Sequence, residues 1–320
     1  MKQEIKTEAI RNAYGEALVN LGSSNTDIVV LDADVSSSTK SINFAKAFPD
    51  RFFNFGIAEA NMVSAAAGMA AMGKIPFVNT FSFLICERSL DQLRACSAYN
   101  KLNVKFAANY GGMSDSFDGA SHHSISDMAI IRSIPGMTLV VLSDSEQTRQ
   151  AVKAVAEYEG PVYLRLCRAE TPVFHTKEDD FVIGKAQALR NGKDVSIVAT
   201  GIMVYRALEA AEMLMTEGID ASVLEVHTIK PLDEAAILQA ARQTGAMVVC
   251  EEHNMIGGLG GAVAEALAHN FPIPVEFVGV ADCYGESGEY LALLEKYGMS
   301  TDAITGSVKA AIKRKDNMER

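Results

Sequence analysis

Phe55-Gly56-Ile57-Ala58-Glu59-Ala60-Asn61-Met62 is the most informative stretch of the sequence. A glycine interrupts the chain, an acid follows three residues later, and residues 63–71 are then mostly small. A helix of such residues can lie very close to a neighbouring backbone. The acid falls in the first turn of this helix, where its charge meets the positive end of the helix dipole. Its carboxyl group is therefore either a helix cap or an acid placed for proton transfer.

The overall composition is that of an ordinary globular protein. The 320 residues are 48% hydrophobic and 22% charged, and the net charge is -11. No basic cluster offsets this charge, which argues against a nucleic-acid or anionic membrane surface. The N-terminus, 1–8, is polar and does not resemble a signal peptide, and no apolar run is long enough to span a membrane. We therefore expect a cytoplasmic protein.

The cysteines and histidines give no sign of a structural metal site. The five cysteines are scattered without a CxxC pair, which is typical of reduced thiols in a cytoplasmic protein. His122 and His123 are the only close pair of histidines, and adjacent residues on a helix do not share a face. We therefore expect no metal ligands in this chain.

Strand and helix patterns alternate along the first half of the chain. Short apolar runs cover 27–31, 75–81, 104–108, 138–142 and 161–166, and helical patterns separate them. Continuous apolar runs are typical of strands that are buried on both faces. Ser143-Asp144-Ser145-Glu146 has the spacing of a capping box and should open the helix after the fourth run. This alternation predicts a mainly parallel sheet.

The pattern lapses between Arg168 and Gly184, where polar and turn-forming residues are common. A second alternating series follows over 195–199, 207–216, 221–226, 234–243, 247–250 and 261–269. The sequence therefore predicts an α/β protein with two doubly wound domains and mainly parallel sheets. We place the domains at 1–170 and 185–320, with a linker at 171–184.

Polar clusters follow several of the predicted strands. Residues 33–38 follow the first strand, Thr80-Phe81 ends the second, and Arg168 follows the last strand of the first domain. The turn Asp118-Gly119-Ala120-Ser121-His122 should open a helix. Ligands of parallel sheets gather at the carboxyl ends of the strands. The clusters together therefore predict a binding site at one edge of the first sheet.

The motifs in this order resemble the C-terminal half of transketolase, over nearly the whole chain. They are the segments 56–64, Asn79-Thr80-Phe81, Asp91-Gln92, 118–122, Arg132-Ser133-Ile134-Pro135 and 228–233. The resemblance implies a thiamine-diphosphate pyrimidine-binding fold followed by a transketolase C-terminal domain. It also implies thiamine diphosphate as the cofactor, and transfer of a two-carbon ketol unit from a ketose to an aldose.

The resemblance further implies a partner subunit. A complete transketolase holds the diphosphate and Mg²⁺ through a Gly-Asp-Gly motif in an N-terminal domain, and this sequence contains no such motif. We therefore expect one subunit of a two-chain transketolase, in a heterotetramer with two copies of each chain. The N-terminal subunit would hold Mg²⁺, and this chain would hold no metal.

Two residues match the family's cofactor positions. By resemblance, Glu59 is the catalytic acid that bonds the pyrimidine ring nitrogen. An acid in a dry pocket of small side chains is suited to sharing its proton with such a base. Phe81 lies where the family stacks an aromatic ring on the pyrimidine, although a phenylalanine at a strand end is otherwise typical of a core. The spacing after Phe81 departs from the family, which leaves open whether Leu84 or Ile85 completes the pocket.

Five residues match substrate-binding positions of the family. Arg11, Ser38 and Arg168 correspond to residues that bind the terminal phosphate of the sugar, although surface charge is the alternative for the arginines. Asp118 and His122 correspond to residues that bond hydroxyl groups of the donor. His122 is also expected to be catalytic, because an imidazole can transfer protons near neutral pH. Its neighbour His123 is expected to be structural.

One departure from the family bears on the substrate. The family usually has a histidine eight positions before the motif aspartate, and here that position is Tyr110. The same loop also adds an acid, Asp115. A neutral phenol in place of a possible cation implies that the donor or the acceptor differs from an ordinary pentose phosphate. A branched sugar phosphate and a sugar with another anionic end both remain open.

Three alternatives to a transketolase subunit remain open from the sequence. The β subunit of a 2-oxo acid dehydrogenase, and a deoxyxylulose-phosphate synthase, share the same pair of domains. A non-catalytic regulatory partner of a transketolase is the third possibility. Such a partner would not need to keep Glu59, His122 and Arg168.

Overall fold

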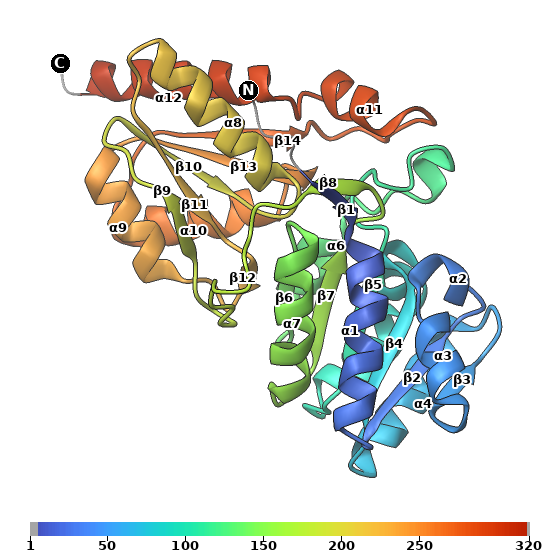
Figure 1. Cartoon of the computed structure of the whole chain (residues 1–320). Helices are drawn as coiled ribbons and strands as arrows, with labels where there is room; N and C mark the ends of the chain where they lie inside the picture. Colours follow the sequence, from blue (N-terminus) through green and yellow to red (C-terminus); the bar gives the residue numbers. More distant parts are fainter. Residues whose placement is uncertain (1–5, 319–320) are drawn as a thin grey trace.

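The computed structural model describes residues 6–318 as two α/β units, each built around its own sheet (Figure 1). Most of the polar N-terminus considered above, 1–5, and the end of the tail, 319–320, lie outside the described residues. The α/β fold class with mainly parallel sheets is confirmed. Among the described helices, none combines the length and apolar character that a membrane span requires.

The first sheet has seven strands in the order β12-β6-β7-β5-β4-β2-β3 and is parallel except at β12. Its strands are β2 (Ile28–Asp32), β3 (Phe52–Asn54), β4 (Ile75–Phe81), β5 (Lys105–Asn109), β6 (Thr138–Val141), β7 (Val162–Leu166) and β12 (Thr228–Lys230). β12 comes from the C-terminal half of the chain and pairs antiparallel with β6. The two halves therefore share one sheet.

Helices cover both faces of this sheet, as the uninterrupted apolar runs predict. One face carries α1 (Ile10–Ser24), α3 (Ile42–Ala47) and α7 (Ser145–Glu157); the other carries α4 (Glu59–Ala71), α6 (Asp127–Ser133) and the π-helical turns η2 (Leu84–Arg88) and η3 (Leu93–Ala98). Short elements fill the connections: α2 (Ser36–Thr39), η1 (Pro49–Arg51), α5 (Leu90–Gln92) and η4 (Gly119–Ser121). Phe77 packs into the core on the first face and Val78 into the core on the second. Successive residues of β4 thus alternate between two buried layers.

The second sheet has the order β14-β13-β10-β11-β9 and is parallel except at β9. Its strands are β9 (Gln187–Arg190), β10 (Val195–Ala199), β11 (Ala221–Glu225), β13 (Met247–Asn254) and β14 (Val275–Val280). α8 (Met203–Thr216) and α12 (Thr301–Met318) lie together on one side, and α9 (Glu234–Thr244) and α10 (Leu259–Asn270) on the other (Figure 1). α11 (Tyr290–Lys296) precedes α12.

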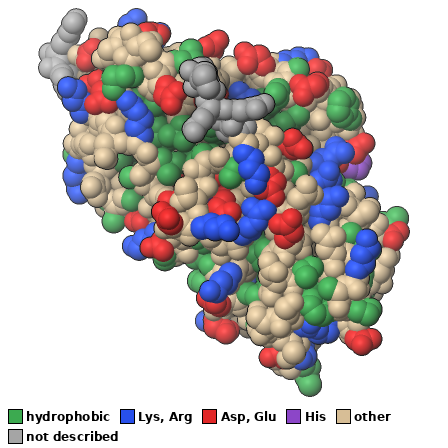
Figure 2. Space-filling view, viewed as in Figure 1, with side chains coloured by type: hydrophobic (Ala, Val, Ile, Leu, Met, Phe, Trp, Pro, Cys, Tyr) green, Lys and Arg blue, Asp and Glu red, His purple; other side chains and the backbone are tan. Residues whose placement is uncertain are grey.

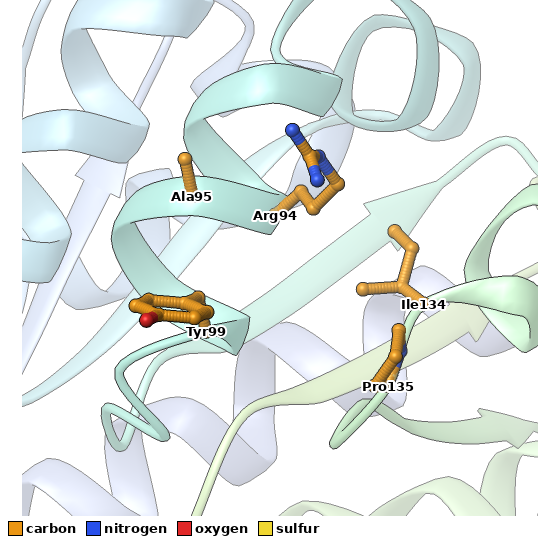
Figure 3. Close-up of a pocket in the computed structure, with 5 residues that line it drawn as sticks. All are labelled: Arg94, Ala95, Tyr99, Ile134 and Pro135. Carbon is orange, nitrogen blue, oxygen red and sulfur yellow. The ribbon is translucent and has the colours of Figure 1, made fainter.

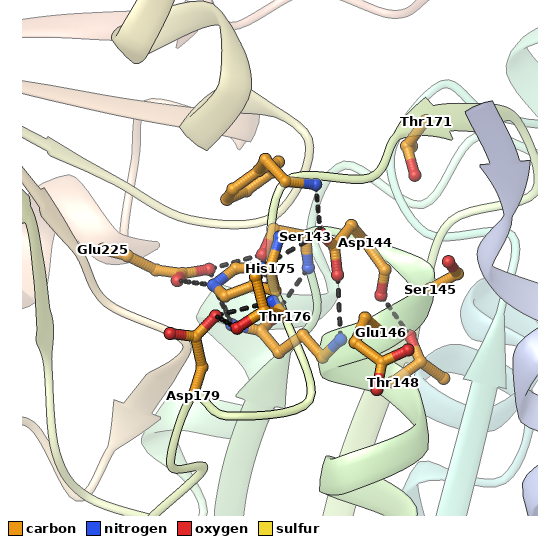
Figure 4. A network of polar contacts seen from close by, with 12 residues as sticks. Ser143, Asp144, Ser145, Glu146, Thr148, Thr171, His175, Thr176, Asp179 and Glu225 are labelled. Atoms are coloured by element: carbon orange, nitrogen blue, oxygen red, sulfur yellow. Dashed lines mark hydrogen bonds and ion pairs between the residues drawn. The ribbon is translucent and has the colours of Figure 1, made fainter. Parts of the chain in front are cut away.

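The connection between the halves is attached to the rest of the fold at two places near its start. β1 (Thr7–Ala9) pairs antiparallel with β8 (Glu170–Pro172) at its start. His175 then lies between two buried carboxylates, with Nδ1 3.1 Å from Oδ2 of Asp144 and Nε2 2.9 Å from Oε2 of Glu225 (Figure 4). Because Asp144 begins α7 and Glu225 ends β11, this network joins the two sheets through the connecting segment.

The predicted capping box is shifted by one residue. Asp144, not Ser143, is the N-cap of α7, and its Oδ1 accepts a hydrogen bond from the backbone N–H of Gln147 over 2.8 Å. The side chain of Gln147 reaches back and accepts from the backbone N–H of Ser143 over 3.0 Å. The sequence pattern predicted the start of the helix correctly but the wrong N-cap residue, because serine and aspartate are both common at this position.

The surface carries charges of both signs. On the face shown in Figure 2, Lys and Arg side chains lie beside Asp and Glu side chains, with hydrophobic side chains scattered among them. All five cysteines are free thiols, and three of them, Cys86, Cys167 and Cys250, are buried.

Candidate active site

Most of the predicted substrate and cofactor residues leave the same edge of the first sheet. The strand register pairs Phe81 of β4 with Asn109 of β5, and Asn109 with Leu166 of β7. Tyr110 and Arg168 follow β5 and β7 closely, so they emerge beside Phe81. The carboxyl ends of parallel strands thus bring together residues that are far apart in sequence.

Tyr110 joins Arg11 and Ser38. Nη1 of Arg11 donates to the phenol oxygen of Tyr110 over 2.8 Å and to the backbone oxygen of Ser38 over 3.2 Å. Tyr110 is 4% exposed and adopts a left-handed backbone conformation with φ 63°. A bulky residue rarely adopts this conformation, which costs about 1–2 kcal/mol. The fold therefore holds the phenol in place beside Arg11 at the expense of local strain.

Arg168 is held on three sides. Its Nη1 lies 2.9 Å from Oδ1 of Asp115, its backbone N–H donates to Oγ of Ser114, and its Cζ lies 5.2 Å from the ring centroid of Tyr110. Burial and the nearby charge of Asp118 raise the pKa of Asp115 to about 6, against the lowering effect of Arg168. The 2.9 Å contact nevertheless pairs the carboxyl group of Asp115 with the guanidinium.

Asp118 and His122 lie beside this pair. They flank η4, a single 3-10 turn, and α6 starts only later, so the expectation that this turn opens a helix is wrong. Ligand atoms of Asp115, Asp118 and His122 lie within 4.8 Å of one another, and within residues 6–318 this is the one group with spacing suited to a metal ion. Arg168 already occupies Asp115, which disfavours a bound cation.

Aromatic rings line the site between these groups. Phe81 stacks on Tyr110 with ring centroids 4.5 Å apart, and Phe83 meets the ring of His122 edge-on at 5.2 Å. Phe81 is half-buried. Leu84 and Ile85, between which the sequence did not decide, are both buried in η2.

Glu59 is buried at the start of α4 and does not act as a cap. It is 5% exposed, and Ala58 precedes it as the N-cap without any side-chain hydrogen bond. Its Oε1 is buried and has no hydrogen-bond partner, and Nη1 of the exposed Arg88 is 4.0 Å away. A buried carboxyl oxygen without a partner is costly and needs an explanation. The residues present therefore fit a ligand with a basic ring nitrogen, such as the pyrimidine of thiamine diphosphate.

The C-terminal half contacts the loop that carries the site, which the sequence did not predict. Oε1 of Glu252, in β13, accepts a hydrogen bond from the backbone N–H of Met113 over 2.7 Å. Gly112 has φ +68° and approaches the Glu252 carboxyl group so closely that a side chain would clash with it. Burial raises the pKa of Glu252 to about 7. No local motif announces this contact, because its partners lie more than a hundred residues apart.

A second segment of the C-terminal half packs on the same loop. The backbone N–H of Gly288 donates to the backbone oxygen of Ser116 over 3.0 Å. His123 is buried against Gly285, and burial lowers the pKa of its imidazole. His123 thus belongs to the packing between the two halves.

A mostly apolar cavity of about 290 Å³ lies elsewhere, between η3 and the residues that follow α6 (Figure 3). It is lined by Arg94, Ala95, Tyr99, Ile134 and Pro135. None of these residues belongs to the predicted site, and the cavity offers few polar groups that could orient a sugar.

Comparison with known proteins finds a matching family domain for each half of the chain. Residues 6–173 match the pyrimidine-binding domain of transketolase, and residues 184–304 match the transketolase C-terminal domain. The chain is 43% identical over 315 residues to the 6-deoxy-6-sulfo-D-fructose transketolase subunit SqwH of a Clostridium species, with 98% of each chain covered. It is 39% identical over 310 residues to an apulose-4-phosphate transketolase subunit of Phocaeicola vulgatus, with 96% of this chain and 98% of that relative covered.

A solved structure agrees with these sequence matches. The chain superposes on a split gene transketolase, described as an inactive β4 tetramer, with a TM-score of 0.89 and 49% identity. The match covers 97% of this chain and 100% of that one. The chain therefore belongs to the transketolase family, which depends on thiamine diphosphate, and it contains the pyrimidine-binding and C-terminal domains of that family.

Proposed function

We propose that this chain is the C-terminal subunit of a two-chain transketolase that transfers a two-carbon ketol unit from an anionic ketose to an aldose. The observation that carries the proposal is the similarity, over almost the full length of both chains, to proteins that are named as transketolase subunits. The buried Oε1 of Glu59, which makes no hydrogen bond, supports it independently.

Glu59 and Phe81 would hold the pyrimidine ring of the cofactor. Bound thiamine diphosphate supplies the nucleophilic carbon and the electron sink. Oε1 of Glu59 would share a proton with the pyrimidine nitrogen, and its burial would keep water from competing for that proton. The exposed part of the Phe81 ring would contact the pyrimidine face.

The remaining residues would bind the ketose from two directions. Asp118 and His122 would bond its hydroxyl groups, and His122 would exchange protons with the reacting oxygens. Arg11, Ser38 and Arg168 would receive its anionic end, because a guanidinium can meet two oxygens of one group. The relatives' names mention a sulfonated and a phosphorylated sugar, which agrees with an anionic substrate.

The enzyme would be complete only with an N-terminal subunit. That subunit would hold the diphosphate and Mg²⁺, and we expect a cytoplasmic heterotetramer with two copies of each chain. The relative described as an inactive β4 tetramer supports the view that C-terminal subunits alone do not turn over substrate.

The experiment that tests the reaction type uses the enzyme assembled from both subunits. Sugar products from a ketose and an aldose should accumulate, whereas pyruvate should not be decarboxylated. Decarboxylation of pyruvate would instead favour the 2-oxo acid dehydrogenase or deoxyxylulose-phosphate synthase alternative. Absence of both reactions in an assembled complex would favour a non-catalytic regulatory partner.

A further inference from the structure

Asp115 is a buried carboxylate that has no role in the proposed reaction. Its side chain is 2% exposed, its Oδ1 pairs with Nη1 of Arg168 at 2.9 Å, and its Oδ2 is buried without a hydrogen-bond partner. Burying a carboxylate costs free energy unless it is paired, and losing one partner of a buried pair costs more. The Arg168 side chain is 35% exposed, so the pair lies where the buried Asp115 meets the open side of the site.

Two guanidinium groups converge on the ring of Tyr110. The Cζ atoms of Arg168 and Arg11 lie 5.2 Å and 5.9 Å from its centroid, and Arg11 also donates to its phenol oxygen. Nε of Arg11 is buried and has no partner. Because the phenol is neutral, the two arginines and Asp115 together carry a single net positive charge.

The other titratable groups nearby add no permanent positive charge. Asp118 and His122 lie within 4.8 Å of Asp115, as measured between ligand atoms. From the C-terminal half, the carboxyl group of Glu252 accepts a hydrogen bond from the backbone of Met113, two residues before Asp115. Since these carboxyl groups can only lower the single positive charge of Arg11, Arg168 and Asp115, the permanent charges around the anion-binding residues sum to at most one positive charge.

We infer that Asp115, by neutralising Arg168, matches this side of the site to a substrate with a singly charged terminal group such as a sulfonate, rather than to a doubly charged phosphate. The inference rests on the proposed function and narrows its substrate class. A phosphate monoester carries about 1.5 to 2 negative charges near neutral pH. Its additional charge would meet an arginine that is already paired, with the carboxylate of Asp115 close by.

The test compares two donors in the assembled enzyme, 6-deoxy-6-sulfo-D-fructose and D-fructose 6-phosphate. The assay is run at about pH 8, well above the pKa of about 6 of Asp115, so that its carboxyl group is ionised. Wild-type enzyme should have the higher kcat/KM with the sulfonate, and Asp115→Asn should shift the ratio of the two values about tenfold toward the phosphate. Asp302→Asn removes the same charge from an exposed position in α12 and should leave the ratio unchanged.

A binding measurement makes the test independent of turnover. Calorimetric titration with methyl sulfate and methyl phosphate should show the same shift in preference, and Asp115→Ser gives a second neutral variant if the amide fails to fold. Unchanged ratios in a folded neutral variant, or a wild-type preference for the dianion, would overturn the inference. Absence of ketol transfer from every donor would instead contradict the proposed function, and the titration would then decide the role of Asp115.

Discussion

Glu59 shows how one buried acid can be recognised as functional rather than structural. Its position in the first turn of α4 fits a helix cap, but it makes no capping hydrogen bond and its Oε1 lacks a partner. Cofactor activation therefore provides a direct test of its role, because a proton-sharing acid and a helix cap predict different outcomes.

Glu59→Gln keeps the shape of the side chain and removes the acid. We expect deuterium exchange at the thiazolium carbon of bound thiamine diphosphate to slow by roughly 10²–10⁴-fold in the assembled enzyme, because one positioned acid is typically worth that much. Exchange is followed by quenched-flow NMR. Glu212→Gln, at an exposed position of α8, is the matched control, and both variants should melt like wild type. An unchanged exchange rate would contradict a catalytic role for Glu59 and favour a structural one.

A second prediction at the residue scale concerns substrate binding by Arg168 and Tyr110. Arg168→Ala removes binding that is present in both the ground state and the transition state, so KM for an anionic ketose should rise about tenfold or more while kcat changes less. Tyr110→His should improve the use of ordinary pentose phosphates relative to the native substrate, because a protonated imidazole adds charge. A panel of phosphorylated, sulfonated and uncharged ketoses measures both effects. Preference for uncharged ketoses, with no effect of Arg168→Ala, would exclude an anion site.

The connecting segment that contains His175 leads to a prediction about the stability of the chain. Burial by itself would lower the pKa of His175, but Asp144 and Glu225 outweigh this effect and raise it from 6.5 to about 10. His175 is thus a cation clamped between α7 and β11. Burial by itself would raise the pKa of Asp144, but its contacts with His175 outweigh this effect and lower the pKa.

His175→Gln should destabilise the chain by about 3–5 kcal/mol near neutral pH, because it leaves two buried carboxylates without their cation. The folded pKa lies above the unfolded value, so the contribution of His175 is complete below about pH 6.5 and disappears as pH rises toward 10. The difference between wild type and variant should therefore shrink above neutral pH by about 1.4 kcal/mol per unit. Urea denaturation at a series of pH values measures it, with the exposed His269→Gln as control. A difference that stays constant would contradict the assignment of charge to His175.

At the same scale, strong local patterns were predictable and tertiary pairings were not. β4 runs over Ile75–Phe81, as its apolar run indicated, and α4 begins at Glu59 as expected. β3 escaped prediction because two of its three residues are exposed and it has no apolar run. β12 escaped it because only pairing with β6 makes Thr228–Lys230 a strand.

The whole molecule brings the two halves together at the site. β12 extends the first sheet, and Glu252 and Gly288 hold the loop that carries Asp115 and Asp118. Motif positions could be recognised in the sequence because each motif is local. Three features could not be recognised in this way, because each depends on contacts between distant segments. They are the strained backbone of Tyr110, the pairing of Asp115 with Arg168 and the hydrogen bond from Met113 to Glu252.

The most direct measurement of the central claim is reconstitution of activity with an N-terminal transketolase subunit from the same source. Ketol transfer is assayed with thiamine diphosphate and Mg²⁺ for each chain alone and for the mixture, and light scattering gives the mass of each species. Each chain alone should be inactive, and the mixture should be active as an assembly with two copies of each chain. Robust turnover by this chain alone, or an assembled complex that transfers no ketol unit, would contradict the account.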